Sequence, residues 1–178
     1  SKAPNYIVGK IAVNGNRVTR NYIILRELSF RTGDSITIGE LVDAFRAAHD
    51  RLVNTHLFNE VVIYLQGFRG NIADVAIDVK ERWYIFPLPY VKPVDRNLAA
   101  WAQKDYSLSR LNYGAKFADY NFSGRGDNLT VWLITGYERE LQLYYNLRNA
   151  DRSQRHGFGF GFNYAGLSEV DALTVNNT

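Results

Sequence analysis

The sequence predicts two structural units in a chain of 178 residues. The first is a mixed α+β unit, and the second is a run of antiparallel β-strands of the kind that forms a membrane-spanning barrel. Helix and strand periodicities alternate up to about residue 82, whereas strand periodicity dominates after it. The later strand segments each have one continuous apolar face. Aromatic residues make up 14% of the chain, which is a high fraction for a small water-soluble domain.

The composition excludes several classes of protein. The net charge is +3, and no run of Lys and Arg is long enough to form a nucleic-acid-binding patch. The absence of cysteine excludes disulfides, thiolate metal sites and cysteine nucleophiles. No apolar run approaches the roughly 20 residues of a membrane-spanning helix. Because the chain contains no Met, we expect that it has been trimmed from a longer product.

The α+β unit opens with a strand and a helix. The strand covers residues 6–14. Alternate residues of a strand share one face, and on one face of this strand they are all apolar or small. That face consists of Ile7, Gly9, Ile11 and Val13. After an Asn-Gly-Asn turn, Thr19 is placed to cap a helix that runs to about Leu28. The residues of this helix expected to point inward are Ile24, Leu25 and Leu28.

A second helix has a stronger signal. Thr37 and Glu40 form a capping box, in which each side chain can accept a hydrogen bond from the other residue's backbone N–H. The helix runs to about Asn54. Its apolar stripe has helical spacing and consists of Leu41, Phe45, Ala48 and Leu52.

Two strands complete the first unit, over residues 58–65 and 72–80. The element order is then β-α-α-β-β, which can form a three-stranded sheet covered on one face by two helices. Asp74 and Asp78 share one face of the last strand. They could hold a cation, but a solvated polar face is the favoured interpretation.

Strands at regular spacing follow residue 82, with a short helical turn expected over residues 95–103. The predicted strands cover residues 83–91, 111–120, 128–137, 140–147 and 156–166, and a sixth starts near Asp171. Pro87 and Pro89 make the first of these an edge or irregular strand.

Aromatic residues alternate with glycines over residues 156–166, which predicts that only one face of this strand contacts an apolar medium. A β-sandwich core and membrane hydrocarbon both meet this need. Strand length, repetition, and tyrosines near the strand ends favour the membrane. The residues predicted to face lipid are Leu129, Val131, Leu133, Leu141, Leu143, Tyr145, Phe158, Phe160, Phe162 and Tyr164. The glycine face should meet a neighbouring strand's large side chains or a crowded barrel lumen.

Several motifs, in this order, resemble a known family. The first unit is similar to a POTRA domain through Val13-Asn14-Gly15-Asn16, Thr19-Arg20, Ile24-Leu25-Arg26-Glu27-Leu28, Phe30, Gly33-Asp34 and Leu57-Phe58. The exit Lys80-Glu81-Arg82-Trp83, then Asn112-Tyr113-Gly114 and residues 119–126, resemble the opening of the barrel in the BamA/TamA family of outer-membrane assembly and secretion proteins. The resemblance implies a POTRA domain over residues 1–82 and the first five or six barrel strands over residues 83–178. Because such barrels have about sixteen strands, we expect the chain to be a piece of a longer protein.

The resemblance also implies a function and a location. The expected role is assembly and insertion of outer-membrane proteins, or protein translocation, in the outer membrane of a Gram-negative bacterium with the POTRA domain in the periplasm. The expected partners are membrane lipid, unfolded outer-membrane clients, periplasmic accessory proteins, and the remaining barrel strands or other copies of the chain. The resemblance implies the strand order first, third, second, so the strand over residues 58–65 is an edge of the POTRA sheet. Clients would pair with this edge, whose predicted binding residues are Phe58, Val61, Val62, Ile63, Tyr64 and Leu65. The alternative is an edge that is solvated or covered by the barrel rim.

Two other functions remain open at this point: a barrel that anchors or exports a fused passenger domain, and a soluble β-rich adhesin or scaffold. An enzyme is not expected. His49, His56 and His156 are not placed to form a metal site, and no hydrolase or phosphate-binding motif is present. We therefore predict no catalytic residue, no metal and no cofactor.

Overall fold

The computed structural model describes residues 4–94, 98–103, 110–151 and 154–167. The chain divides into two compact units. The first unit contains the residues up to Trp83 together with two later segments, Asn121–Asp127 and Arg148–His156. The second contains Tyr84–Tyr120, Asn128–Leu147 and the residues from Gly157 onward.

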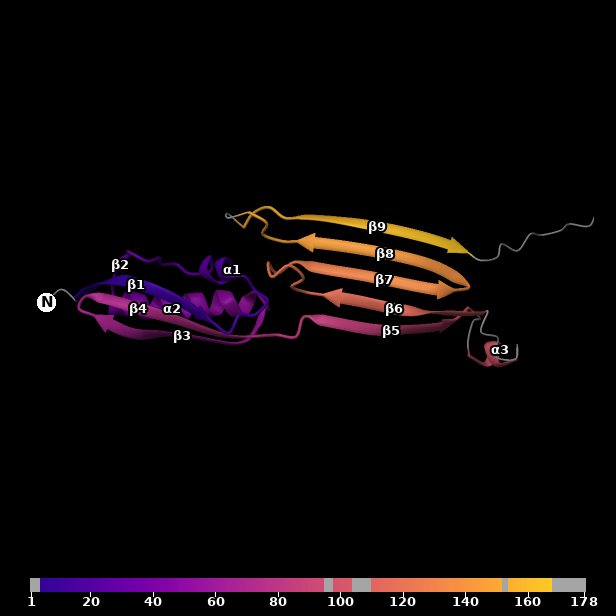
Figure 1. Cartoon of the computed structure of the whole chain (residues 1–178), viewed down its shortest axis with the longest axis horizontal. Helices are drawn as coiled ribbons and strands as arrows, with labels where there is room; N and C mark the ends of the chain where they lie inside the picture. The colour runs from indigo at the N-terminus through magenta and orange to yellow at the C-terminus, as the bar shows by residue number, and fades with distance from the viewer. Residues whose placement is uncertain (1–3, 95–97, 104–109, 152–153, 168–178) are drawn as a thin grey trace, which may run out of the picture. The chain divides into compact units, whose positions relative to one another are not determined.

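The first unit is a four-stranded sheet with helices (Figure 1). Its elements are β1 (Asn5–Asn14), α1 (Asn21–Leu25), β2 (Ser35–Thr37), α2 (Ile38–Asn54), β3 (Phe58–Arg69) and β4 (Ile72–Glu81). The strand order is β2-β1-β4-β3, in which β1 and β4 are parallel and the other pairs are antiparallel. The order of the three long strands is the predicted one, whereas the three-residue β2 was not predicted.

The core of this unit lies between the sheet and α2. Val8, Phe30 and Val75 are buried together, and Phe45 of α2 packs against them. The predicted capping box is present at the start of α2. The Thr37 N–H donates to Glu40 Oε2 (2.9 Å), and the Glu40 N–H donates to Thr37 Oγ1 (3.3 Å). The other stripe residues, Leu41, Ala48 and Leu52, are fully buried.

The predicted first helix is much shorter than expected. It covers only α1, and its N-cap residue is Arg20 without a side-chain cap, so the assignment of Thr19 as the cap is wrong. The side chain of Thr19 is engaged elsewhere, with Asn121. Ile23 and Ile24 point inward, whereas Leu25 is exposed, contrary to expectation. Leu28 packs against the core from the segment after the helix.

The predicted apolar face of β1 is wrong at one point, because the register with β4 shifts between Val8 and Ile11. The shift lets Val8 and Ile11 both pack against the core, although they belong to opposite faces of a regular strand. Within this shift, the Lys10 N–H donates to the Asp74 side chain (2.8 Å). A Cβ on Gly9 would overlap the Asp74 carboxylate, so a larger residue there would displace Asp74.

The second unit is a five-stranded antiparallel sheet in chain order (Figure 1). Its elements are β5 (Ile85–Pro93), α3 (Leu98–Ala102), β6 (Leu111–Asp119), β7 (Asn128–Gly136), β8 (Glu138–Leu147) and β9 (Phe158–Leu167). The predicted strands are confirmed, although β5 and β9 begin two residues later, and β8 two residues earlier, than expected. The predicted sixth strand lies outside the described residues. None of the helices within the described ranges is long and apolar enough to cross a membrane.

Candidate functional site

The outer edge of the first sheet is β3, which pairs only with β4 in the described part of the chain. Two backbone hydrogen bonds give the direction of the peptide groups in β4. On the β1 side, Ile7 N–H donates to the Asn71 carbonyl (2.8 Å), and on the β3 side, Arg82 N–H donates to the Leu57 carbonyl (3.0 Å). Peptide groups alternate in direction along a strand, so the even-numbered residues of β4 bond to β3.

The register carries this alternation into β3. Between residues 60 and 65, even-numbered residues of β4 pair with even-numbered residues of β3. The N–H and C=O groups of Val61, Ile63 and Leu65 are therefore directed at the outer edge. Register shifts after Phe58 and after Leu65 limit this regular stretch to residues 60–65.

The six residues predicted to bind partners all lie on β3. Phe58 and Val61 are buried, and Ile63 and Leu65 pack against the core, so these residues have only backbone groups to offer. Val62 and Tyr64 point to the opposite face and are 44% and 38% exposed. Binding of a partner at this edge stays a prediction.

Asp74 and Asp78 of β4, the strand next to this edge, both form hydrogen bonds within the protein. Arg69 donates to both Asp74 oxygens (2.9 and 3.0 Å), and these bonds, with that of the Lys10 N–H, hold the pKa of Asp74 below its usual range. Asp78 accepts hydrogen bonds from Asn14 (2.8 Å) and from the Tyr64 hydroxyl (3.0 Å). The bond to Asp78 raises the pKa of Tyr64. The geometry therefore fits a hydrogen-bonded polar face.

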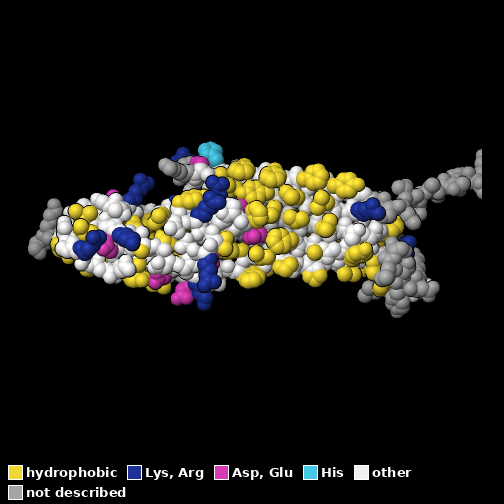
Figure 2. All heavy atoms as spheres, viewed as in Figure 1, with side chains coloured by type: hydrophobic (Ala, Val, Ile, Leu, Met, Phe, Trp, Pro, Cys, Tyr) yellow, Lys and Arg dark blue, Asp and Glu magenta, His cyan; other side chains and the backbone are white. Residues whose placement is uncertain are grey.

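The ten residues predicted to face lipid share one face of the second sheet. Leu129, Val131 and Leu133 of β7 pair with Tyr145, Leu143 and Leu141 of β8, and these pair with Phe160, Phe162 and Tyr164 of β9. Directly paired residues point to the same side of a sheet. Phe158, Phe160, Phe162 and Tyr164 are each more than half exposed. Figure 2 shows hydrophobic side chains gathered over the second sheet.

This exposure distinguishes the two media that the sequence left open. A sandwich core would bury these aromatics under a second sheet, whereas they are exposed within the described part of the chain. A contiguous exposed apolar surface of this kind marks an interaction site. Contact with lipid stays a prediction that this geometry favours.

One glycine of β9 lies opposite a large side chain, as predicted, whereas Gly159 pairs with Asn146. Gly161 pairs with Tyr144 of β8, and a Cβ on Gly161 would lie 2.8 Å from the Tyr144 ring. The same face of the sheet carries polar contacts. Lys116 lies 4.7 Å from the centre of the Trp132 ring, and Asn112 exchanges two hydrogen bonds with Glu138 (2.8 and 2.9 Å). One apolar and one polar face is the pattern of a barrel strand.

The outer edge of β5 lacks most of its hydrogen-bond donors. Tyr120 N–H donates to the Tyr84 carbonyl (3.1 Å), and Val94 N–H donates to the Arg110 carbonyl (3.0 Å), so even-numbered residues of this strand bond to β6. The odd-numbered residues, directed away from β6, are Ile85, Pro87, Pro89, Val91 and Pro93. Proline has no N–H, so only Ile85 and Val91 carry a donor among them.

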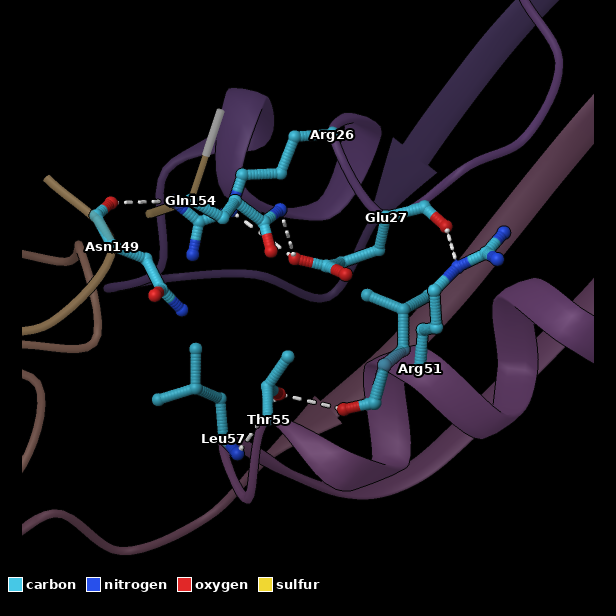
Figure 3. Close-up of polar contacts among 8 residues, drawn as sticks. Arg26, Glu27, Arg51, Thr55, Leu57, Asn149 and Gln154 are labelled. Atoms are coloured by element: carbon cyan, nitrogen blue, oxygen red, sulfur yellow. Dashed lines mark hydrogen bonds and ion pairs between the residues drawn. The ribbon is translucent and has the colours of Figure 1, made fainter. Parts of the chain in front are cut away.

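The segment 148–156 belongs to the first unit and meets it around Glu27 (Figure 3). Glu27 is 8% exposed, and its carboxylate accepts hydrogen bonds from Arg26 (3.2 Å) and Gln154 (3.1 Å). Arg26 also donates to the Asn149 carbonyl (3.2 Å), and Arg51 of α2 donates to the Glu27 carbonyl (2.6 Å). Donors from two segments thus reach the buried carboxylate, and a third segment, α2, binds the backbone carbonyl of the same residue.

Sequence reasoning missed a second carboxylate, Glu81 at the end of β4. Its oxygens accept the N–H groups of Arg17 (3.0 Å), Val18 (3.0 and 3.1 Å) and Thr19 (2.6 Å). Burial acts to raise the pKa of Glu81, but the Thr19, Val18 and Arg17 donors together outweigh it, and the pKa is lowered. The sequence contains no local signal for this contact, because Glu81 is more than 60 residues from the loop it binds.

Comparison with known proteins identifies the class of the first unit. Residues 6–82 match the POTRA family, described as a surface antigen variable number repeat. No curated protein matches the chain.

A solved structure of BamA shares the fold of nearly the whole chain. The crystal structure of BamA from Haemophilus ducreyi lacking POTRA domains 1–3 has a TM-score of 0.61 at 21% identity and covers 91% of this chain. CdiB from Acinetobacter baumannii has a TM-score of 0.41 at 13% identity and covers 80% of this chain. This chain spans 28% and 26% of the length of those two chains. The predicted fold, a POTRA domain followed by antiparallel strands arranged as in the BamA structure, is confirmed.

Proposed function

We propose that this chain works in a non-enzymatic outer-membrane factor that assembles, inserts or translocates other proteins. Its POTRA domain would lie in the periplasm, and the second sheet would lie in the membrane as part of a barrel with further strands. The POTRA match over residues 6–82, the BamA fold and the exposed apolar face of the second sheet support this role. The role requires no cofactor, and its partners are lipid, unfolded outer-membrane clients and periplasmic accessory proteins.

The finer proposal is that clients add a strand to β3. The observation that carries it is the row of peptide groups at Val61, Ile63 and Leu65, which is directed outward over the regular stretch 60–65. Each of these residues can exchange two hydrogen bonds with an antiparallel strand. Backbone bonds of this kind give affinity with little sequence specificity, which suits a factor that handles many clients.

Hydrogen exchange tests this proposal in the full chain, folded in detergent micelles. The probe is a synthetic peptide with the sequence of β8, residues 138–147, because it alternates apolar and polar residues as a barrel strand does. We expect the Val61, Ile63 and Leu65 amides to become about tenfold more protected when the peptide binds. The Val62 and Tyr64 amides should change little, because they already bond to β4.

The controls use proline, which cannot donate within a strand. The same peptide with proline at alternate positions should give no added protection. The variant Ile63→Pro should weaken binding of the original peptide while the Ile77 amide in β4 stays protected. Strand addition at β3 would be ruled out if the peptide raised the protection of odd- and even-numbered amides equally, or raised neither.

A further inference from the structure

The loop between β1 and α1 is held from two sides by segments distant in sequence. Three consecutive N–H groups of the loop, at Arg17, Val18 and Thr19, donate to the Glu81 carboxylate. The next N–H, at Arg20, donates instead to the Gly124 carbonyl (2.9 Å). Four consecutive amides are thus shared between the end of β4 and the segment 121–127.

The segment 121–127 has its own internal structure. Asn121 and Asp127 are fully buried. Asn121 Oδ1 accepts the Gly126 N–H (2.7 Å), and Asp127 Oδ1 accepts the Ser123 N–H (2.9 Å). Gly124 N–H donates to the Asn121 carbonyl (3.0 Å). Buried side-chain oxygens that bind the turn's own N–H groups in this way favour one conformation of the turn.

This turn makes side-chain contacts with the loop as well. Asn121 Nδ2 donates to Thr19 Oγ1 (2.9 Å), and Thr19 is only 2% exposed. The Arg20 guanidinium donates to the Ser123 carbonyl (3.0 Å). Gly124 adopts a positive φ of 78°, and a Cβ there would overlap the Val18 carbonyl oxygen. The close approach therefore depends on glycine.

We propose that the segment 121–127 is a latch for the β1–α1 loop of the POTRA domain. When the turn is seated, it closes the loop at Arg20, which is the N-cap residue of α1. When the turn leaves, Glu81 still holds residues 17–19, but the start of α1 loses its partners. The POTRA domain is then complete only after the chain has formed the turn that links β6 to β7.

Hydrogen exchange at single amides separates the two sides of this arrangement. In Asn121→Ala, we expect protection of the Arg20 amide to fall by about tenfold, while that of the Thr19 amide changes by less than about twofold. In Glu81→Ala, the pattern should reverse, with the Thr19 amide losing protection and the Arg20 amide keeping most of it. The measurement uses the full chain in detergent micelles.

A second variant and a matched control keep the test decisive. Gly124→Ala should reproduce the effect of Asn121→Ala, because the added Cβ displaces the turn. Phe122→Ala changes an exposed side chain of the same turn and should leave both amides unchanged. Protection of the Ile77 amide in β4 reports that the domain is folded. If the Arg20 and Thr19 amides lose protection together in both turn variants, or neither does, the latch is refuted.

Discussion

One edge strand of each sheet, β3 in the first and β5 in the second, can be compared by the backbone N–H groups that it directs outward. At β3, Val61, Ile63 and Leu65 direct both N–H and C=O groups outward. At β5, the outward positions retain every C=O, but three of the five are proline. Open sheet edges bind other strands indiscriminately unless they are blunted. A further strand could therefore find fewer N–H donors at β5 than at β3.

The largest expected effect comes from removing this difference. The triple variant Pro87→Val, Pro89→Val and Pro93→Val gives β5 three added outward N–H groups. Each hydrogen bond contributes about 0.5–1.5 kcal/mol net, so we expect the dissociation constant for self-association in micelles to fall by about tenfold or more. Light scattering after size-exclusion chromatography measures it.

The matched control for this variant is Leu88→Val. Its N–H belongs to the even-numbered set directed at β6, so it adds no donor to the outer edge. It should leave the monomer–dimer equilibrium unchanged. An unchanged equilibrium in the triple variant as well would show that the missing donors do not limit pairing at β5.

The strands of the second sheet could be predicted because alternation is local. Leu141, Leu143 and Tyr145 alternate with polar residues, and a one-residue slip of β8 would turn this apolar face to the other side of the sheet. The direction of the β5 peptide groups could not be predicted, because it depends on which residues of β6 lie opposite the prolines. The position of β3 at the edge followed from the strand order of the resemblance.

The errors in the first unit have a common physical cause. The register shift near Gly9 comes with a hydrogen bond from the neighbouring Lys10 N–H to Asp74. The Thr19 side chain accepts a hydrogen bond from Asn121 instead of capping α1. Each pair is separated by more than 60 residues, so no local pattern reveals it. The three residues of β2 are also too few to show a period. Helix α2 was predicted correctly because its capping box and stripe lie within one segment.

A smaller effect is expected from loosening the strand that holds β5. Gly114 lies on β6, and a Cβ there would overlap the Leu133 carbonyl oxygen of β7. Because backbone cannot yield as a side chain does, Gly114→Ala should lower the free energy of unfolding of the second sheet by about 1–3 kcal/mol. Gly161→Ala is the matched control, since its Cβ meets the Tyr144 ring, which can tilt. Urea denaturation in micelles compares them, and equal losses would contradict this reasoning.

The smallest expected effect is a pH dependence confined to the sheet that carries the β3 edge. The pKa values of Asp74 and Glu81 are lowered in the folded state by hydrogen bonds to Arg69 and to the loop N–H groups. A lowered folded pKa means that the contribution to stability is complete above the unfolded pKa and is lost as the pH falls through the folded pKa. We therefore expect the urea midpoint of the first unit, followed by the amide signals of β4, to decrease below about pH 5. Glu81→Gln should lower the free energy of unfolding at pH 7 by less than about 1 kcal/mol and flatten the decrease of the urea midpoint in acid. A variant that keeps the full acid dependence would show that the loop N–H groups do not stabilise the charged form of Glu81.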